Sequence, residues 1–308
     1  MGENMSWRSL LISKGGKLSL KNNQLLIWQE EKEFSVPLED IAIIVVECRE
    51  VVITAPLLSA FGLYGITLLT CDEQCLPCGQ FLPFNQYCRQ YKTLKLQLEM
   101  SQPLKKQLWR KIVKQKILHQ SWVLKEIGCE AESQRLEKMA KQVKSGDKDN
   151  LEAQSAVLYF HTLFGKKFSR KTENNINAHL NYAYIVLRSA VARSLVLHGW
   201  LPQFGIFHCN ELNAFNLADD FIEPFRPIVD LRVWQLWENG TLSEHLSPST
   251  KQSLIKLLHY QMTFQQETLS VLAAIDGCVG SLQTALLNKN ADWLKMPEIR
   301  SLAEHFYE

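Results

Sequence analysis

The densest group of chemically capable side chains lies between Gly205 and Asp230, in the stretch GIFHCNELNAFNLADDFIEPFRPIVD. It holds one histidine, five carboxylates, two prolines and one arginine. Asp219 and Glu223 are four residues apart, so on a helix they share one face, with Asn216 on the same side. Like charges at this spacing destabilise a helix unless a cation lies between them. The pattern favours a metal site and a solvated acidic face equally.

Pro224 directly follows Glu223 and predicts that the helix kinks or ends there. Such a break would direct the carboxylate of Glu223 inward, away from the regular helix surface. His208 precedes the predicted helix, where a histidine is more often a cap or a packing residue than a ligand. The Asp219-Asp220 pair is likewise more often a solvated face.

A second candidate is Glu152, in the stretch DNLEAQSAVLYFHTLFGKKFSR. It lies in the first turn of a predicted apolar helix that Asp149 or Asn150 can cap. Its carboxylate could bind a cation, or simply complement the helix dipole. Basic and aromatic residues alternate at the end of this helix, which suits a phosphodiester backbone and suits a solvated basic turn about as well; they are Phe164, Lys166, Lys167, Phe168, Arg170 and Lys171.

Cysteines form the third candidate group, which comprises Cys71, Cys75, Cys78 and Cys88. Cys75-x-x-Cys78 resembles half of a zinc site, but no second pair completes it at a useful spacing. Ordinary thiols are therefore favoured. Cys209 adjoins His208, yet adjacent side chains on an extended chain point apart, so no nucleophilic side chain is predicted.

The elements that must position these residues are of two kinds. Short strands fill the chain up to residue 82, and the pairs Gly15-Gly16 and Asn22-Asn23 predict tight hairpins between them. Thr54 can cap a short helix that ends at Gly65. We expect an antiparallel sheet or small sandwich from the strands Leu10–Ser13, Lys17–Lys21, Gln24–Trp28, Glu33–Pro37, Ile41–Val46, Val51–Thr54 and Ile66–Thr70.

Helical spacing of apolar residues dominates after Pro83. The predicted fold class is α+β, with a small N-terminal antiparallel β domain (1–82) and a larger all-α C-terminal domain (83–308). The predicted helices are Tyr87–Met100, Pro103–Ile127, Glu132–Lys144, Leu151–Phe164, Ile176–His198, Ala214–Trp237, Pro248–Ile275 and Gly280–Asn288.

The overall composition says little about partners, because the formal net charge is only +2. From Arg89 to Lys144, however, 14 basic residues face 5 acidic ones, a local excess of 9. Eight cysteines in a chain of 308 residues are not needed as disulfide staples. With no signal-like or membrane-length apolar segment, we expect a reduced, cytoplasmic protein without a membrane contact. Residues Met1 to Asn4 are expected to contribute nothing to the fold.

Several blocks of the sequence resemble the CRISPR-associated integrase and endonuclease family "Cas one", and within it the type II branch. The likeness begins with PLEDIAIIVVE from Pro37 and the VVITAPLLSA stretch that follows it. It continues through NLEAQSAVLYF, LFGKKFSR and NINAHLNYAYIVLRSAVA. It ends with FNLADDFIEPFRPIVD. The last two blocks are long and specific, and the resemblance covers nearly the whole chain.

The resemblance implies a homodimer and a Glu–His–acid set around Mg²⁺ or Mn²⁺. At the matching positions these ligands and catalytic residues are Glu152, His208 and Glu223, with Asp219 and Asp220 as alternatives to Glu223. It implies a metal-dependent hydrolase of antiviral defence that joins the 3′-hydroxyl ends of captured DNA to the CRISPR repeat. The implied partners are double-stranded DNA, the small companion "Cas two" and the type II effector nuclease.

Binding of DNA requires cations that meet phosphates. The candidates are Lys166, Lys167, Arg170, Arg188, Arg193 and Arg226, followed by the basic segment around Lys105–Lys116. Arg226 could equally form a structural ion pair with Glu223. Two other functions are open on the sequence alone: a free-standing metal-dependent nuclease acting on branched or single-stranded DNA, and a non-catalytic DNA-binding scaffold.

Overall fold

The computed structural model describes residues 8–83, 87, 89–243 and 245–306. Two of the expectations above, the irrelevance of Met1 to Asn4 and the thiol of Cys88, lie outside the described residues.

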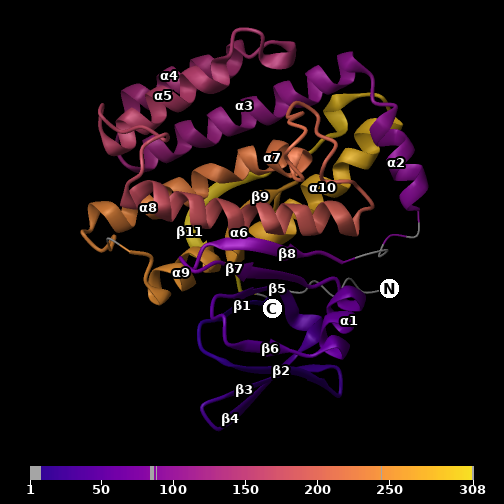
Figure 1. Ribbon diagram of the computed structural model, residues 1–308. Coiled ribbons are helices and arrows are strands. Elements are labelled where there is room, and N and C mark those ends of the chain that lie inside the picture. Colours follow the sequence, from indigo (N-terminus) through magenta and orange to yellow (C-terminus); the bar gives the residue numbers. More distant parts are fainter. Residues whose placement is uncertain (1–7, 84–86, 88, 244, 307–308) are drawn as a thin grey trace.

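Two four-stranded sheets, one α-helix and the short 3-10 helix η1 (Leu38–Asp40) make up the described N-terminal part (Figure 1). One sheet has the order β1-β5-β7-β8 and the other the order β4-β3-β2-β6. Their bounds are β1 Arg8–Ile12, β2 Gly16–Lys21, β3 Gln24–Gln29, β4 Lys32–Pro37, β5 Ile41–Val46, β6 Val51–Ile53, α1 Ala55–Tyr64, β7 Thr67–Cys71 and β8 Pro77–Phe81.

Turn chemistry is confirmed at one predicted hairpin and wrong at the other. Asn22 and Asn23 adopt φ of 50° and 58° between β2 and β3, as a tight hairpin requires. Gly15-Gly16 instead leads from β1 in one sheet to β2 in the other. Thr54 is the N-cap residue of α1 by position but makes no side-chain capping bond, whereas the left-handed Gly65 after α1 is as predicted.

Strand direction differs from the expected antiparallel pairing. Strands β1, β5 and β7 are parallel to one another, and β2 pairs in parallel with β6. Parallel neighbours need long crossovers, and the β2–β4 hairpins and α1 provide them. Strand β8 was not predicted, because Pro77 and Gly79 indicate a turn; both are tolerated since β8 is an edge strand.

Strand β5 is buried on both faces. Ile43 and Val45 belong to the large core shared with the helices, whereas Ile44 and Val46 belong to a smaller core with Leu18. This explains the unbroken apolar run IAIIVV, which is typical of a strand covered on both sides.

The larger C-terminal part is mostly helical, as predicted, and its helices lie in layers above the first sheet (Figure 1). Helix α6 packs on β7 and β8, α7 and α8 pack on α6, and α3 packs on α4, α5 and α8. The bounds are α2 Gln90–Leu98, α3 Gln102–Glu126, α4 Glu130–Gln142, η2 Ser145–Asp147, α5 Leu151–Phe164, α6 Asn175–Leu197, α7 Asn216–Ile222, η3 Glu223–Phe225, α8 Arg226–Glu238, α9 Pro248–Ile255, η4 Lys256–His259 and α10 Val271–Leu287.

The C-terminal part is not all-α, and the helix predicted over Pro248–Ile275 is wrong in its middle. A three-stranded sheet of order β10-β9-β11 lies there, formed by β9 (Tyr260–Phe264), β10 (Glu267–Ser270) and β11 (Glu298–Glu304). Alternate side chains Met262 and Phe264 of β9 are buried, which is a strand period rather than a helical one. No helix among the described residues is long and apolar enough to span a membrane.

Candidate metal centre and its surroundings

Helix α3 carries a lysine where a core residue is expected. Lys116 is only 6% exposed and lies one turn after the buried Ile112. Its ammonium contacts a carboxylate oxygen of Glu152 and one of Glu223. Burial would lower the pKa of Lys116, but the charges of Glu223 and Glu152 raise it above its ordinary value, so the ammonium stays protonated.

Glu152 reaches this ammonium from the first turn of α5. The helix start is fixed by Asp147, whose two carboxylate oxygens accept the amides of Leu151 and Glu152 at 2.9 and 3.0 Å. The cap predicted at Asp149 or Asn150 is therefore wrong: Asn150 is the N-cap residue by position but makes no capping bond. Asp147 places the backbone of Glu152 directly.

Glu223 reaches the same ammonium from the break that Pro224 predicts. A short 3-10 helix, η3, separates α7 from α8 at this point. His119 of α3 lies with Nδ1 at 2.5 Å from the carbonyl oxygen of Pro224, and burial lowers its pKa to about 4. A neutral His119 that donates from Nδ1 to the carbonyl of Pro224 connects the end of α7 and η3 to α3.

Charge compensation at Glu223 involves a second cation. Arg226 Nε lies 3.2 Å from Glu223 Oε1. Burial would raise the pKa of Glu223, but Arg226 and Lys116 outweigh it and lower the pKa. Of the two roles open for Arg226, the structure shows the ion pair.

The carboxylate of Asp220, on α7, holds His208 through its backbone amide and its imidazole. That carboxylate is 0% exposed and accepts the amides of Ile206, Phe207 and His208 at 2.5, 3.1 and 3.1 Å. Its Oδ1 also lies 2.8 Å from His208 Nδ1. This hydrogen bond raises the pKa of His208, and it leaves Nε2 as the nitrogen that could meet a ligand.

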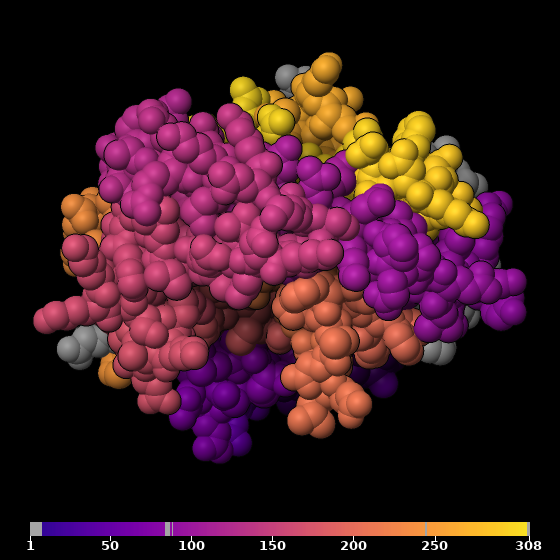
Figure 2. All heavy atoms as spheres, turned by 90° about the horizontal axis from the view of Figure 1, so that it is seen from above, coloured from indigo at the N-terminus to yellow at the C-terminus, as the bar shows by residue number. Residues whose placement is uncertain are grey.

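Aromatic rings hold the imidazole from the side. Phe207 stacks on Trp109 of α3 at a centroid distance of 4.2 Å, and His208 meets Trp109 edge-on at 5.7 Å. Seen from above, the surface is hollowed between the pink surface around α5 and the orange surface before α7 (Figure 2). His208 itself borders a pocket of about 490 Å³ together with Lys105, Asn210 and Asn216.

The three predicted ligands are only partly brought together. Glu152 and Glu223 meet at one cation, whereas His208 pairs with Asp220 and is coupled to Glu223 through its charge. Within the described part of the chain, no three histidine, cysteine or acidic side chains are grouped closely enough to hold a metal ion.

The donor set nevertheless fits a divalent ion at one point. Two carboxylates sharing one cation are oxygen ligands of the kind that Mg²⁺ and Mn²⁺ bind, and in this structure the ammonium of Lys116 is the cation that they share. Asp219 is engaged elsewhere, with Asn213 at 2.6 Å and Arg188 at 3.8 Å.

The predicted phosphate-binding cations differ in their surroundings. Lys166 and Lys167 are exposed on the turn after α5. Arg170 bonds to Asn177 and Asn181 and lies 5.3 Å from the Tyr184 ring. Arg188 lies over the Phe215 ring at 4.9 Å and is 3.8 Å from Asp219. Of these four cations, Lys166 and Lys167 are therefore the most accessible to a phosphate.

Arg193 fits a structural role better than the predicted phosphate contact. Its Nε donates to the carbonyl of Gly65 at 2.6 Å, and burial lowers its pKa to about 10. It thereby joins α6 to the end of α1.

Sequence reasoning missed Lys116, His119 and Asp147. Lys116 was part of the basic segment assigned to DNA, yet it is buried. One signal in the sequence indicated that Lys116 is buried. It lies four residues after Ile112, so it continues the apolar stripe of α3.

Among the described members of the cysteine group, Cys71, Cys75 and Cys78, the side chains do not gather into a metal-binding cluster. Cys71, Cys75 and Cys78 are free thiols, and burial raises the pKa of Cys71 to about 12. Next to them Lys251 of α9, 2% exposed, pairs with Glu47 after β5, so a buried ion pair joins the two parts of the chain.

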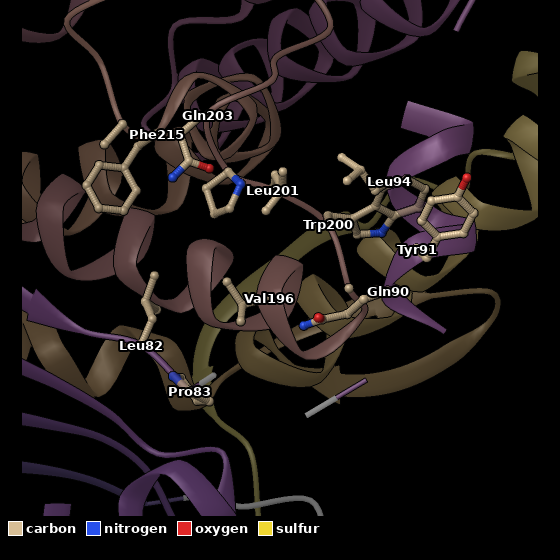
Figure 3. Close-up of a pocket in the computed structure, with 13 residues that line it drawn as sticks. Leu82, Pro83, Gln90, Tyr91, Leu94, Val196, Trp200, Leu201, Gln203 and Phe215 are labelled. Carbon is tan, nitrogen blue, oxygen red and sulfur yellow. The ribbon is translucent and has the colours of Figure 1, made fainter. Parts of the chain in front are cut away.

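An apolar pocket of about 410 Å³ lies apart from these charges, between α2 and the end of α6 (Figure 3). Tyr91 and Leu94 border it on one side and Leu82 and Pro83 on another. It shares Gln203 and Ala214, the latter not labelled in the figure, with the pocket beside His208.

The fold and the site define a two-part α+β protein whose helical part gathers two glutamates around one cation. The family model described as CRISPR associated protein Cas1 matches residues 10–257. The chain therefore belongs to the Cas1 family, the "Cas one" family that the sequence resembles.

Known relatives agree with this assignment. The CRISPR-associated endonuclease Cas1 of Neisseria meningitidis serogroup C (strain 8013) is 59% identical over 304 residues, covering 99% of this chain and 100% of the relative. A casposase bound to an integration product has a TM-score of 0.75 at 19% identity, covering 92% of this chain and 91% of its own. A Cas6-RT-Cas1–Cas2 complex has a TM-score of 0.75 at 16% identity, covering 98% of this chain and 37% of the other. The last two show likeness of fold.

Proposed function

We propose that this protein is a divalent-metal-dependent DNA strand transferase that joins captured DNA fragments to the CRISPR repeat. The observation that carries the proposal is the convergence of Glu152 and Glu223 on one cation position, in a chain of the Cas1 family. Identity of 59% to a Cas1 endonuclease over nearly the whole chain, and a fold like that of a casposase, support it.

The reaction is a transesterification. The 3′-hydroxyl of the fragment gives up its proton and its oxygen attacks a phosphodiester of the repeat. A new phosphorus–oxygen bond forms, the bond from phosphorus to the 3′-oxygen of the cut strand breaks, and that leaving oxygen takes up a proton. Mg²⁺ or Mn²⁺, held by Glu152, Glu223 and Nε2 of His208, would supply activation of the hydroxyl and neutralisation of phosphate charge.

The protein's own groups have distinct tasks in this proposal. Asp220 engages Nδ1 of His208, so that Nε2 is the nitrogen that would serve as a ligand, and Arg226 keeps Glu223 ionised. Lys166 and Lys167 hold the backbone of the DNA near the hollow between α5 and α7. No side chain is proposed as nucleophile.

The proposed partners are a second copy of this chain, double-stranded DNA, a Cas2 protein and the effector nuclease of the same system. The fold likeness to a chain of a Cas1–Cas2 complex supports the choice of Cas2. The proposed location is the cytoplasm.

The test supplies the purified protein with Mn²⁺, a DNA fragment and a plasmid that carries the repeat. We expect joined products from a fragment with a 3′-hydroxyl and none from a fragment with a dideoxy end. Glu152→Ala, His208→Ala and Glu223→Ala should each abolish joining in folded protein. Glu238→Ala, at an exposed position at the end of α8, is the matched control and should join normally.

The outcomes separate this function from the two alternatives. Cleavage without joining would indicate a free-standing nuclease. DNA binding with no activity, unaffected by Glu152→Ala, would indicate a scaffold. Joining that persists in His208→Ala would remove the imidazole from the ligand set.

A further inference from the structure

Lys116 occupies a position that is costly for a lysine unless something compensates it. Its side chain lies on the buried face of α3, next to Val113 and Ile117, which are both 0% exposed. A buried ammonium is stable only when it is paired and hydrogen-bonded. Glu152 and Glu223 provide that pairing from two other elements.

The reverse also holds, because the two carboxylates need the ammonium. Glu223 is 5% exposed and Glu152 is half-buried, and both point at the same nitrogen. Without a cation between them, two like charges would face each other in a region of low dielectric. The lysine therefore holds in place the pair of acids that a divalent ion would need.

The position between Glu152 and Glu223 cannot hold the ammonium and a divalent ion at once. At contact distance the repulsion between the two cations would exceed the attraction of a second cation to the carboxylates. This inference rests on the proposed function. We propose that Lys116 is a built-in counter-ion: it keeps Glu152 and Glu223 together in the metal-free protein, and it must leave their shared position when a divalent cation binds. Its flexible four-carbon stem allows the ammonium to leave without movement of α3.

The first experiment measures Mn²⁺ affinity by calorimetry on the full-length protein, the Lys116→Met variant and the control Lys125→Met. Methionine keeps the length and apolar stem of the lysine and removes the charge. Lys125 is an exposed lysine of the same helix. We expect Lys116→Met to bind Mn²⁺ at least about tenfold more tightly, or about 1.4 kcal/mol, and Lys125→Met to bind as the wild type does.

A second measurement on the wild type does not depend on the folding of Lys116→Met. Reductive methylation followed by mass spectrometry reports how accessible each lysine is. We expect Mn²⁺ to increase the modification of Lys116 and to leave that of Lys125 unchanged. Equal modification of Lys116 with and without Mn²⁺ would overturn the proposal.

Failure of this inference is distinguishable from failure of the proposed function. Glu152→Gln identifies binding at this site, because it removes one of the two charges. If the wild type binds Mn²⁺ through Glu152 and Lys116→Met binds no more tightly, only the counter-ion role is refuted. If neither protein binds Mn²⁺ in a way that depends on Glu152, the metal site itself is refuted, and with it the counter-ion role.

Discussion

Replacing Asp220 should loosen the segment that carries His208. The buried carboxylate accepts three consecutive backbone amides and lies within hydrogen-bond distance of the imidazole. Asparagine has the same size but only one acceptor oxygen, and its amide group would face donors. Asp220→Asn therefore leaves several donors without an acceptor, while the volume of the side chain is unchanged.

The expected loss of stability follows from where these donors lie. The amide of Ile206 is buried and loses a bond to a charged acceptor, which costs about 1.5–3 kcal/mol. The amides of Phe207 and His208 are near the surface, where water replaces the carboxylate and the cost is about 0.5–1.5 kcal/mol each. In total we expect Asp220→Asn to lower the free energy of unfolding by about 2.5–6 kcal/mol, toward the lower end where the remaining amide oxygen keeps an acceptor in place.

Urea unfolding gives the free energy, and hydrogen exchange of the peptide spanning 205–210 locates the change. Asp219→Asn is the matched control: Asp219 is partly exposed and accepts from a side chain rather than from this backbone segment. We expect the control to cost less than about 1 kcal/mol. Unchanged stability and unchanged exchange in Asp220→Asn would refute the role assigned to this carboxylate.

Three further predictions concern other parts of the chain. Asp147→Ala should lower the free energy of unfolding by about 1–2 kcal/mol, because two amides of α5 lose their acceptor, while Asp149→Ala should not; thermal unfolding checks this. The buried Asp230 has its pKa raised to about 6 from 3.8, so the folded state binds this proton more tightly and the free energy of unfolding falls by about 2 kcal/mol as the pH rises from 4 to 6. Asp230→Asn should remove that loss, so its stability relative to the wild type should rise over this range in urea titrations at each pH; a constant difference would contradict it. The double variant Lys166→Ala/Lys167→Ala should weaken DNA binding irrespective of sequence and reduce the salt slope by about 1–2; an unchanged slope in fluorescence anisotropy would exclude these lysines as phosphate contacts.

Local chemistry made most of the elements predictable. The Asn22-Asn23 hairpin, the end of α1 at Gly65, and the break at Pro224 each follow from the conformational limits of a few residues. Helix α5 begins and ends as its apolar spacing predicts, at Leu151 and Phe164. The α+β class followed from the change of period near residue 83.

Pairing over long sequence distances could not be predicted in the same way. Whether β1 pairs with β2 or with β5 depends on which apolar face is covered, and both choices satisfy the local pattern. The strands β9 and β10 were mistaken for helix because their apolar residues are few and the neighbouring helices continue the pattern on both sides.

The same limit applies to the site. Glu152 and Glu223 are 71 residues apart in the sequence and converge on one ammonium, whereas His208, predicted with them, pairs with Asp220. The identity of that cation in the structure, Lys116, was not foreseen, because a lysine in a basic helix is ordinarily a surface residue. Only its spacing from Ile112 indicated a buried position.

The two-faced strand β5 has a consequence for how this protein unfolds. Neighbouring residues such as Ile44 and Val45 pack in different cores. Unfolding of either core therefore exposes one face of the same strand to water. The β part and the helical part should therefore lose their structure together, in a single calorimetric transition. A fragment ending near residue 82 would present the bare side of β5 to water and aggregate rather than fold alone.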